Sequence, residues 1–184
     1  MQILFSEENL KYDGSQLTSH FAYRRFGILG DSCVAFLGPC EVGLTAMVDL
    51  EDVRRQAPIF SREMLHFVAE SFSFDLRAAA TFQRLMVATV QAELAQRGLS
   101  RIQRRGDDLY AGDGKLSVSI ATVSPVSTMI HLGLNVVGEG APVQAIGLRD
   151  LGMDPREFGG RCLKAFSEDY QGILRAATKV RGVE

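Results

Sequence analysis

The sequence contains few cysteines, no tryptophan and no long basic or apolar run. Its 184 residues include three cysteines, Cys33, Cys40 and Cys162. An odd number of widely spaced cysteines is not a disulfide framework. No CxxC pair and no His/Cys group has the spacing of a zinc site. We therefore expect free thiols and predict no metal site.

Charge and hydropathy argue against two further classes of protein. The net charge is −2, and no run of Lys and Arg forms the basic surface that nucleic acids require. The opening MQILFSEENLKYDG lacks the basic and long apolar regions of a signal peptide. No window approaches the roughly 20 apolar residues of a membrane span. We expect a cytoplasmic protein that binds neither nucleic acid nor a membrane.

Length and periodicity predict the fold class. A chain of 184 residues with 46% hydrophobic residues suits a single domain, residues 1–184. Apolar residues at three- and four-residue steps predict helices over 76–97 and 155–179, and similar spacing predicts one over 60–70. A short helix is expected at 51–55. Strands are expected at 1–5, 32–37, 42–49, 116–123 and 129–137, with a weaker one at 143–148. The predicted fold is α+β, with helices packed on a mostly antiparallel sheet.

The segment RGDDLYAGDGK, residues 105–115, is the candidate for chemistry. A Gly-rich turn delivers Lys115 to the start of a strand in which every other residue is small: Ser117, Ser119 and Ala121. A face of small residues lets a ligand lie close to the backbone, and a lysine at its rim can neutralise a carboxylate or phosphate. The alternative is an exposed lysine beside a hairpin turn.

The stretch GDDLYAGDGKLSVSIATVSPVSTMIHLGLNV resembles the central segment of the biotin/lipoate protein ligase and octanoyltransferase superfamily, which has a class II synthetase-like fold. The matching elements are Asp107-Asp108-Leu109, Gly114-Lys115, residues 117–121 and residues 133–136. Upstream, Arg24-Arg25-Phe26-Gly27 with Gly30, and then Gly38-Pro39, resemble an Arg-Gly-Gly loop and a Gly-Pro turn. The chain is also similar to a small prokaryotic branch marked by YDGSQL and RRFGILGD, which implies no particular activity.

The resemblance implies acyl or cofactor transfer. Ligases of the superfamily join a carboxylic acid to ATP, with magnesium, and pass the acyl group to a carrier lysine, whereas transferases use a cysteine. By resemblance, Lys115 is the catalytic residue that contacts the acyl carbonyl or phosphate. The implied ligand-binding residues are Arg24, Arg25, Gly27, Gly30, Gly38, Asp108, Ser117 and Asn135.

The departures from the superfamily pattern leave three functions open. Residues 143–147 lack the transferase cysteine, so Cys40 supplies a thiol only if the fold brings it near Lys115 with a lowered pKa. The chain is then an ATP-dependent ligase for a small carboxylic acid, or an acyl-carrier-dependent transferase, or a non-catalytic descendant that binds a small ligand or self-assembles into a homo-oligomer. The expected partners are an acid or acyl group and an acidic carrier protein docked on a local basic cluster, Arg101, Arg104 and Arg105.

The three histidines receive separate interpretations. His66 and His131 lie among apolar residues, and we expect both to be buried and hydrogen-bonded. His20 precedes the Arg-Gly loop, and both a structural and a functional role stay open for it. No Ser/His/Asp order can be defended from the spacing.

Overall fold

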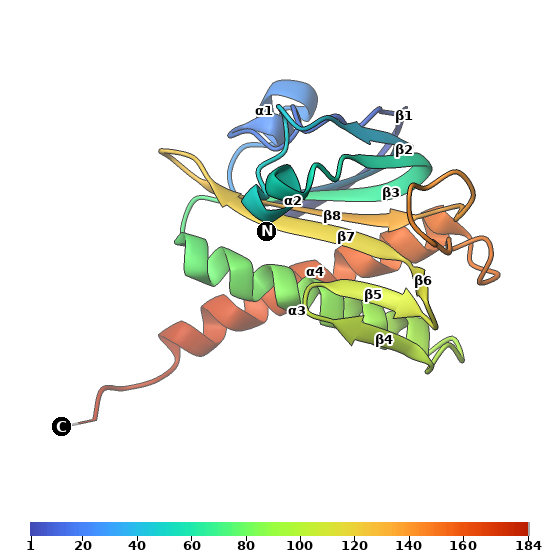
Figure 1. Ribbon diagram of the computed structural model, residues 1–184. Coiled ribbons are helices and arrows are strands. Elements are labelled where there is room, and N and C mark those ends of the chain that lie inside the picture. Colours follow the sequence, from blue (N-terminus) through green and yellow to red (C-terminus); the bar gives the residue numbers. More distant parts are fainter. Residues whose placement is uncertain (184) are drawn as a thin grey trace.

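The computed structural model, which describes residues 1–183, has a five-stranded sheet with two long helices on one face (Figure 1). The sheet has the order β1-β2-β3-β8-β7, and a second, three-stranded sheet has the order β4-β5-β6. The strands are β1 Gln2–Asn9, β2 Ser32–Val42, β3 Ile59–Ser71, β4 Ile102–Arg105, β5 Asp108–Ala111, β6 Gly114–Lys115, β7 Ser117–Val123 and β8 Thr128–Asn135. The helices are α1 Phe21–Phe26, α2 Leu50–Arg55, α3 Leu76–Ala95 and α4 Pro155–Thr178.

The pairing confirms the predicted α+β class. β1 pairs with β2 in parallel, and the other neighbouring strands of both sheets are antiparallel. The predicted long helices and the strands at 116–123 and 129–137 are present, with small shifts at their ends. None of the helices between residues 1 and 183 combines the length and apolar character needed to cross a bilayer.

The two faces of the large sheet carry unequal cores. One face packs against α3 and α4. Asp75 and Asp154 are the N-cap residues of these helices, and each side chain accepts a hydrogen bond from a backbone N–H of the first turn. The other face has a smaller core: Tyr12, Ala22, Val34, Phe36, Cys40, Val42, Met64 and Val68. Short segments rather than long helices cover this second face, which leaves room for a cavity.

The helix predicted at 60–70 is wrong, because this segment is strand β3. Residues 64–71 are all buried in the centre of the sheet. A strand covered on both faces carries apolar residues on both and does not alternate. Its irregular apolar spacing therefore imitated the spacing of a helix.

Three strand predictions are also wrong. β2 continues through Gly38-Pro39 to Val42, because the register with β3 shifts between Gly38 and Cys40 and leaves Pro39 out of that ladder. The strand predicted at 42–49 is absent, since residues 43–49 leave the sheet before α2. The segment 143–148 forms a single bridge, between Ala145 and Lys115, rather than a strand.

Candidate functional site

A cavity of about 500 Å³ lies on the face of the large sheet that α3 and α4 leave uncovered. Its floor consists of side chains from β3, β7 and β8: Met64, Val118, Ile120, His131 and Asn135. Its walls come from four places: residues 12–17, residues 46–61, the small sheet with Asp108, Tyr110 and Lys115, and residues 141–143. Both sheets and three further segments therefore converge on one space.

Lys115 and Asp108 form an ion pair in the wall of this cavity. The Lys115 Nζ lies 2.7 Å from Oδ2 of Asp108, and the two side chains are 28% and 19% exposed. Burial pulls the pKa of Lys115 down, but attraction to Asp108 outweighs it and the net shift is upward. Burial, together with repulsion from Asp107 and Asp52, raises the pKa of Asp108, and the net shift is upward although Lys115 lowers it. The ammonium therefore stays charged, and Asp108 is the partner that more easily loses its charge.

The backbone of Lys115 is held on both sides. Its N–H donates to the carbonyl of Gln144 at 2.9 Å, and its carbonyl accepts from the N–H of Ile146 at 3.1 Å. The side-chain amide of Asn135 donates to the same carbonyl, also at 3.1 Å. Asn135 thus fixes the lysine from the floor of the cavity. The structure brings together Lys115, Asp108 and Asn135 from the predicted set.

The charged side chains around the cavity are mostly acidic. The lining carboxylates are Asp49, Glu51, Asp52, Asp107 and Asp108, and the lining cations are Arg55 and Lys115. A polyanion entering this space meets net repulsion, whereas a single carboxylate at Lys115 meets a local positive charge.

The Arg-Gly segment lies elsewhere. Figure 1 places α1 beside β1 and β2, at the other end of the sheet order from β7. Arg25 pairs with Glu8, and Arg24 donates to Thr18 at 3.2 Å. Gly27 and Gly30 follow with positive φ, as the end of a short helix and a turn require. Arg24, Arg25, Gly27 and Gly30 line neither described hollow.

Three other predicted residues serve the fold and do not line the cavity. Gly38 lies so close to Leu10 that a Cβ would stand 1.9 Å from the Leu10 carbonyl oxygen. The Ser117 hydroxyl accepts from the N–H of Leu109 at 2.8 Å, on a side chain with no exposed surface. Cys40 is fully buried, and burial raises the pKa of its thiol to about 12.

The histidine prediction is confirmed, but the sequence did not reveal that His66 and His131 touch. Both are buried, and Nδ1 of His66 lies 3.0 Å from Nε2 of His131. His131 also lines the cavity beside Tyr12, the first residue of the YDGSQL signature, to which no role had been assigned from the sequence. The available signal was the strand period of two, which puts His131 and Asn135 on one face of β8.

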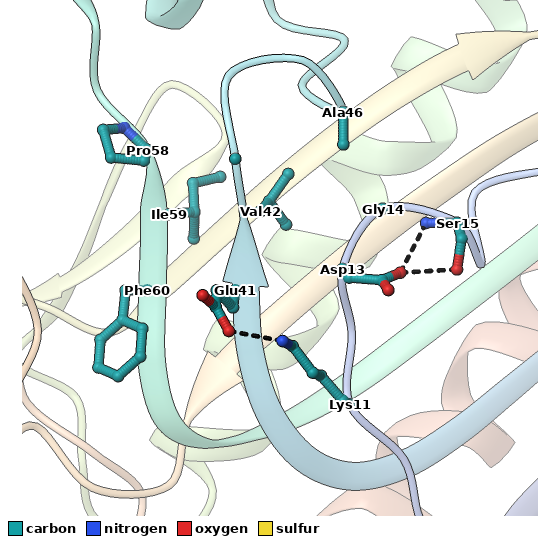
Figure 2. Close-up of a pocket in the computed structure, with 11 residues that line it drawn as sticks. Lys11, Asp13, Gly14, Ser15, Glu41, Val42, Ala46, Pro58, Ile59 and Phe60 are labelled. Carbon is teal, nitrogen blue, oxygen red and sulfur yellow. Dashed lines mark hydrogen bonds and ion pairs between the residues drawn. The ribbon is translucent and has the colours of Figure 1, made fainter.

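A second, more open hollow of about 800 Å³ lies alongside (Figure 2). It shares Gly14, Val42, Ala46, Pro58, Ile59 and Phe60 with the first cavity. Figure 2 shows its charged groups turned toward one another: Lys11 pairs with Glu41 at 2.5 Å, and Asp13 accepts from Ser15. Because these groups satisfy each other at the surface, we take the cavity at Lys115 as the candidate site.

Comparison with known proteins identifies the family. A model described as "Domain of unknown function (DUF366)" matches residues 1–181. The chain belongs to this DUF366 family. The DUF366 protein is 41% identical over 159 residues to "Uncharacterized protein MJ0805" of Methanocaldococcus jannaschii, covering 83% of this chain and 72% of that protein.

Solved structures extend the comparison to the ligase fold. A "Protein of Unknown Function from Pyrococcus horikoshi" has a TM-score of 0.94 and 46% identity, over 100% of this chain and 99% of that one. The Aquifex aeolicus biotin protein ligase in complex with biotin and ATP has a TM-score of 0.60 and 15% identity, over 92% and 70%. Lipoate-protein ligase A bound with ATP has a TM-score of 0.52 and 16% identity, over 93% and 86%. At these identities the ligases show the fold alone, and they confirm the fold expected from the resemblance.

Proposed function

We propose that this DUF366 protein binds a small carboxylic acid, with the Lys115 ammonium holding the carboxylate. The observation that carries this proposal is a charged, three-quarters-buried lysine, fixed by its backbone in the wall of a cavity of about 500 Å³. That volume lies in the range of small-molecule sites. The ligase fold supports the proposal, since one neighbour is described as a complex with biotin and ATP.

Asp108 gives the site a way to exchange one carboxylate for another. Without ligand, it supplies the counter-charge of Lys115 at 2.7 Å. A bound carboxylate would place two anions beside one ammonium, and like charges raise each other's pKa. The pKa of Asp108 is already raised by burial, so Asp108 takes up a proton as the acid binds. Acid binding is then accompanied by proton uptake.

The residues present do not fit a triphosphate well. Five lining carboxylates face two lining cations, and the segment with Arg24 and Arg25 lies away from the cavity. Among residues 1–183, no group of three or more His, Cys, Asp or Glu side chains is arranged to hold a metal ion. The proposal is therefore acid binding, and no adenylation step is derived from these residues.

The transferase alternative lacks a thiol at the site. Cys33, Cys40 and Cys162 are all buried, and burial raises the pKa of Cys33 and Cys40 to about 12. We expect none of the three thiols to react with Ellman's reagent in the native protein over an hour, and all three to react in denaturant. Rapid labelling of one thiol in the native state would contradict this expectation and return the transferase to consideration.

Lys115→Met is expected to weaken acid binding by about 10- to 100-fold, because a charge-assisted hydrogen bond contributes about 1.5–3 kcal/mol. Isothermal titration with octanoate measures the change, and circular dichroism checks the fold. Lys164→Met, on the exposed side of α4, is the matched control and should bind like the wild type.

Equal octanoate affinity in the wild type and Lys115→Met would rule out the proposed role of Lys115.

The same titration with Mg-ATP present tests ligation. Acid-dependent pyrophosphate release would show that the protein activates the acid after binding it.

A further inference from the structure

His66 and His131 form a hydrogen-bonded chain with a defined direction. Nε2 of His66 lies 3.2 Å from the carbonyl oxygen of Gly38. A carbonyl only accepts, so this nitrogen carries the proton of the neutral ring, and Nδ1 of His66 is an acceptor. The donor to that acceptor is Nε2 of His131 at 3.0 Å. Nδ1 of His131 is therefore left with a free lone pair.

This lone pair belongs to a buried ring that lines the cavity. His131 is only 3% exposed and is part of the cavity floor. Among residues 1–183, the sealed and unpartnered side-chain polar atoms are Ser32 Oγ and Arg97 Nε. The hydrogen bond of the His131 ring uses Nε2, and none is found at Nδ1 within the described part of the chain. Because the ring is part of the cavity lining, we take Nδ1 as the unpaired acceptor offered to a ligand.

Aromatic stacking fixes the direction of this acceptor. The Tyr12 ring lies 3.7 Å from the His131 ring, at an interplanar angle of 8°. Phe36 stacks on His66 at 5.0 Å. Burial lowers the pKa of His66 to about 3 and that of His131 well below its usual range, so both rings are neutral near pH 7. Nδ1 of His131 remains an acceptor in these conditions.

We propose that Nδ1 of His131 selects carboxylic acids that carry a neutral O–H or N–H group at the end remote from the carboxylate. This inference rests on the proposed function, in which Lys115 holds the carboxylate. A site with a buried acceptor discriminates strongly against a ligand that leaves the acceptor unpaired.

The separation of His131 and Asn135 along β8 indicates the length of the ligand between its two polar ends. Asn135 holds the backbone of Lys115, and His131 lies four residues before it, about 13 Å along an extended strand. The floor between them includes the apolar side chains Val118, Ile120 and Met64. The chemical class is therefore a carboxylate, an apolar spacer on the order of 10 Å and a terminal hydroxyl or amide.

The test compares 8-hydroxyoctanoate with nonanoate, which replaces the hydroxyl by a methyl group of similar size. We expect the wild type to bind the hydroxy acid at least about fivefold more tightly by isothermal titration, as one hydrogen bond implies. His131→Phe is expected to abolish this preference, because the phenyl ring can still stack on Tyr12 but carries no hydrogen-bond acceptor. His20→Phe is the matched control, since His20 lies outside the cavity, and it should retain the preference.

The outcomes separate the inference from the function on which it rests. If both acids bind in a Lys115-dependent way without preference for the hydroxyl, or if His131→Phe keeps the preference, the inference is overturned and acid binding stands. If neither acid binds, the proposed function and this subsite both fail. Nitrogen-15 NMR gives a readout free of ligand: a proton on Nδ1 of His131 at pH 7 would also overturn the inference.

Discussion

Acidification from pH 6.5 to pH 4.5 is expected to lower the free energy of unfolding by more than about 2 kcal/mol, because His66 contributes about that much and His131 adds to it. The folded state holds both rings neutral because burial lowers their pKa values, that of His66 to about 3. A histidine in the unfolded chain has a pKa near 6.5. Below that pH the unfolded state therefore binds more protons than the folded state. The free energy of unfolding then decreases as the pH is lowered.

Burial keeps both rings neutral, and the hydrogen-bond chain adds a penalty for protonating His66. A protonated His66 would carry a hydrogen on Nδ1, which lies 3.0 Å from the protonated Nε2 of His131. Two donors would then face each other in a buried site. Each histidine contributes a slope of about 1.4 kcal/mol per pH unit in this window. The loss through His66 ends near its folded pKa of about 3.

Urea unfolding of the wild type and His131→Gln at several pH values measures the effect. The variant retains a donor to His66 and loses one titrating ring, so its slope between pH 6.5 and 4.5 should fall to about half. Above pH 7 the two curves should run parallel. Identical slopes in both proteins would show that His131 titrates in the folded state.

Local sequence patterns predicted those parts of the fold that have one buried face. α3 and α4 each bury a single stripe, and the sequence of β7 alternates between apolar and small residues, so their periodicities predicted these elements. β3 is buried on both sides, and its pattern misled. β2 passes through Pro39 because a register shift absorbs it, which depends on the neighbouring strand. Both effects depend on tertiary contacts, so a short stretch of sequence does not predict them.

The residues of the candidate site also fall into two groups: those that a local segment predicts and those that only the tertiary fold brings together. Lys115 and Asp108 are seven residues apart across a tight turn, so a local segment already indicated that they belong together. His66 and His131 are 65 residues apart, and Tyr12 reaches them from a third segment. Their contact depends on the pairing of β3 with β8 and on the path of residues 10–12. Local sequence could therefore place the lysine in the site but not the acceptor.

Gly38→Ala is expected to destabilise the protein by about 3 kcal/mol or more, in the upper range for overpacking. A Cβ at this position would lie 1.9 Å from the carbonyl oxygen of Leu10 and 2.6 Å from its carbonyl carbon. Both atoms belong to the backbone, so no side-chain rotation relieves the clash. Moving that backbone would strain the hydrogen bonds from Leu10 N to Leu37 O and from Tyr12 N to Pro39 O, each 2.9 Å.

The same substitution links the fold to the site, because Gly38 accepts from His66 and the displaced segment carries Tyr12. Urea unfolding at pH 7 measures the loss of stability. Gly172→Ala is the matched control: it lies on the exposed side of α4 with nothing within 4 Å, and should gain up to about 1 kcal/mol from helix propensity. A Gly38→Ala protein as stable as the wild type would show that residues 10–12 move freely. Tyr12 could then not hold the His131 ring in the direction that the acceptor subsite requires.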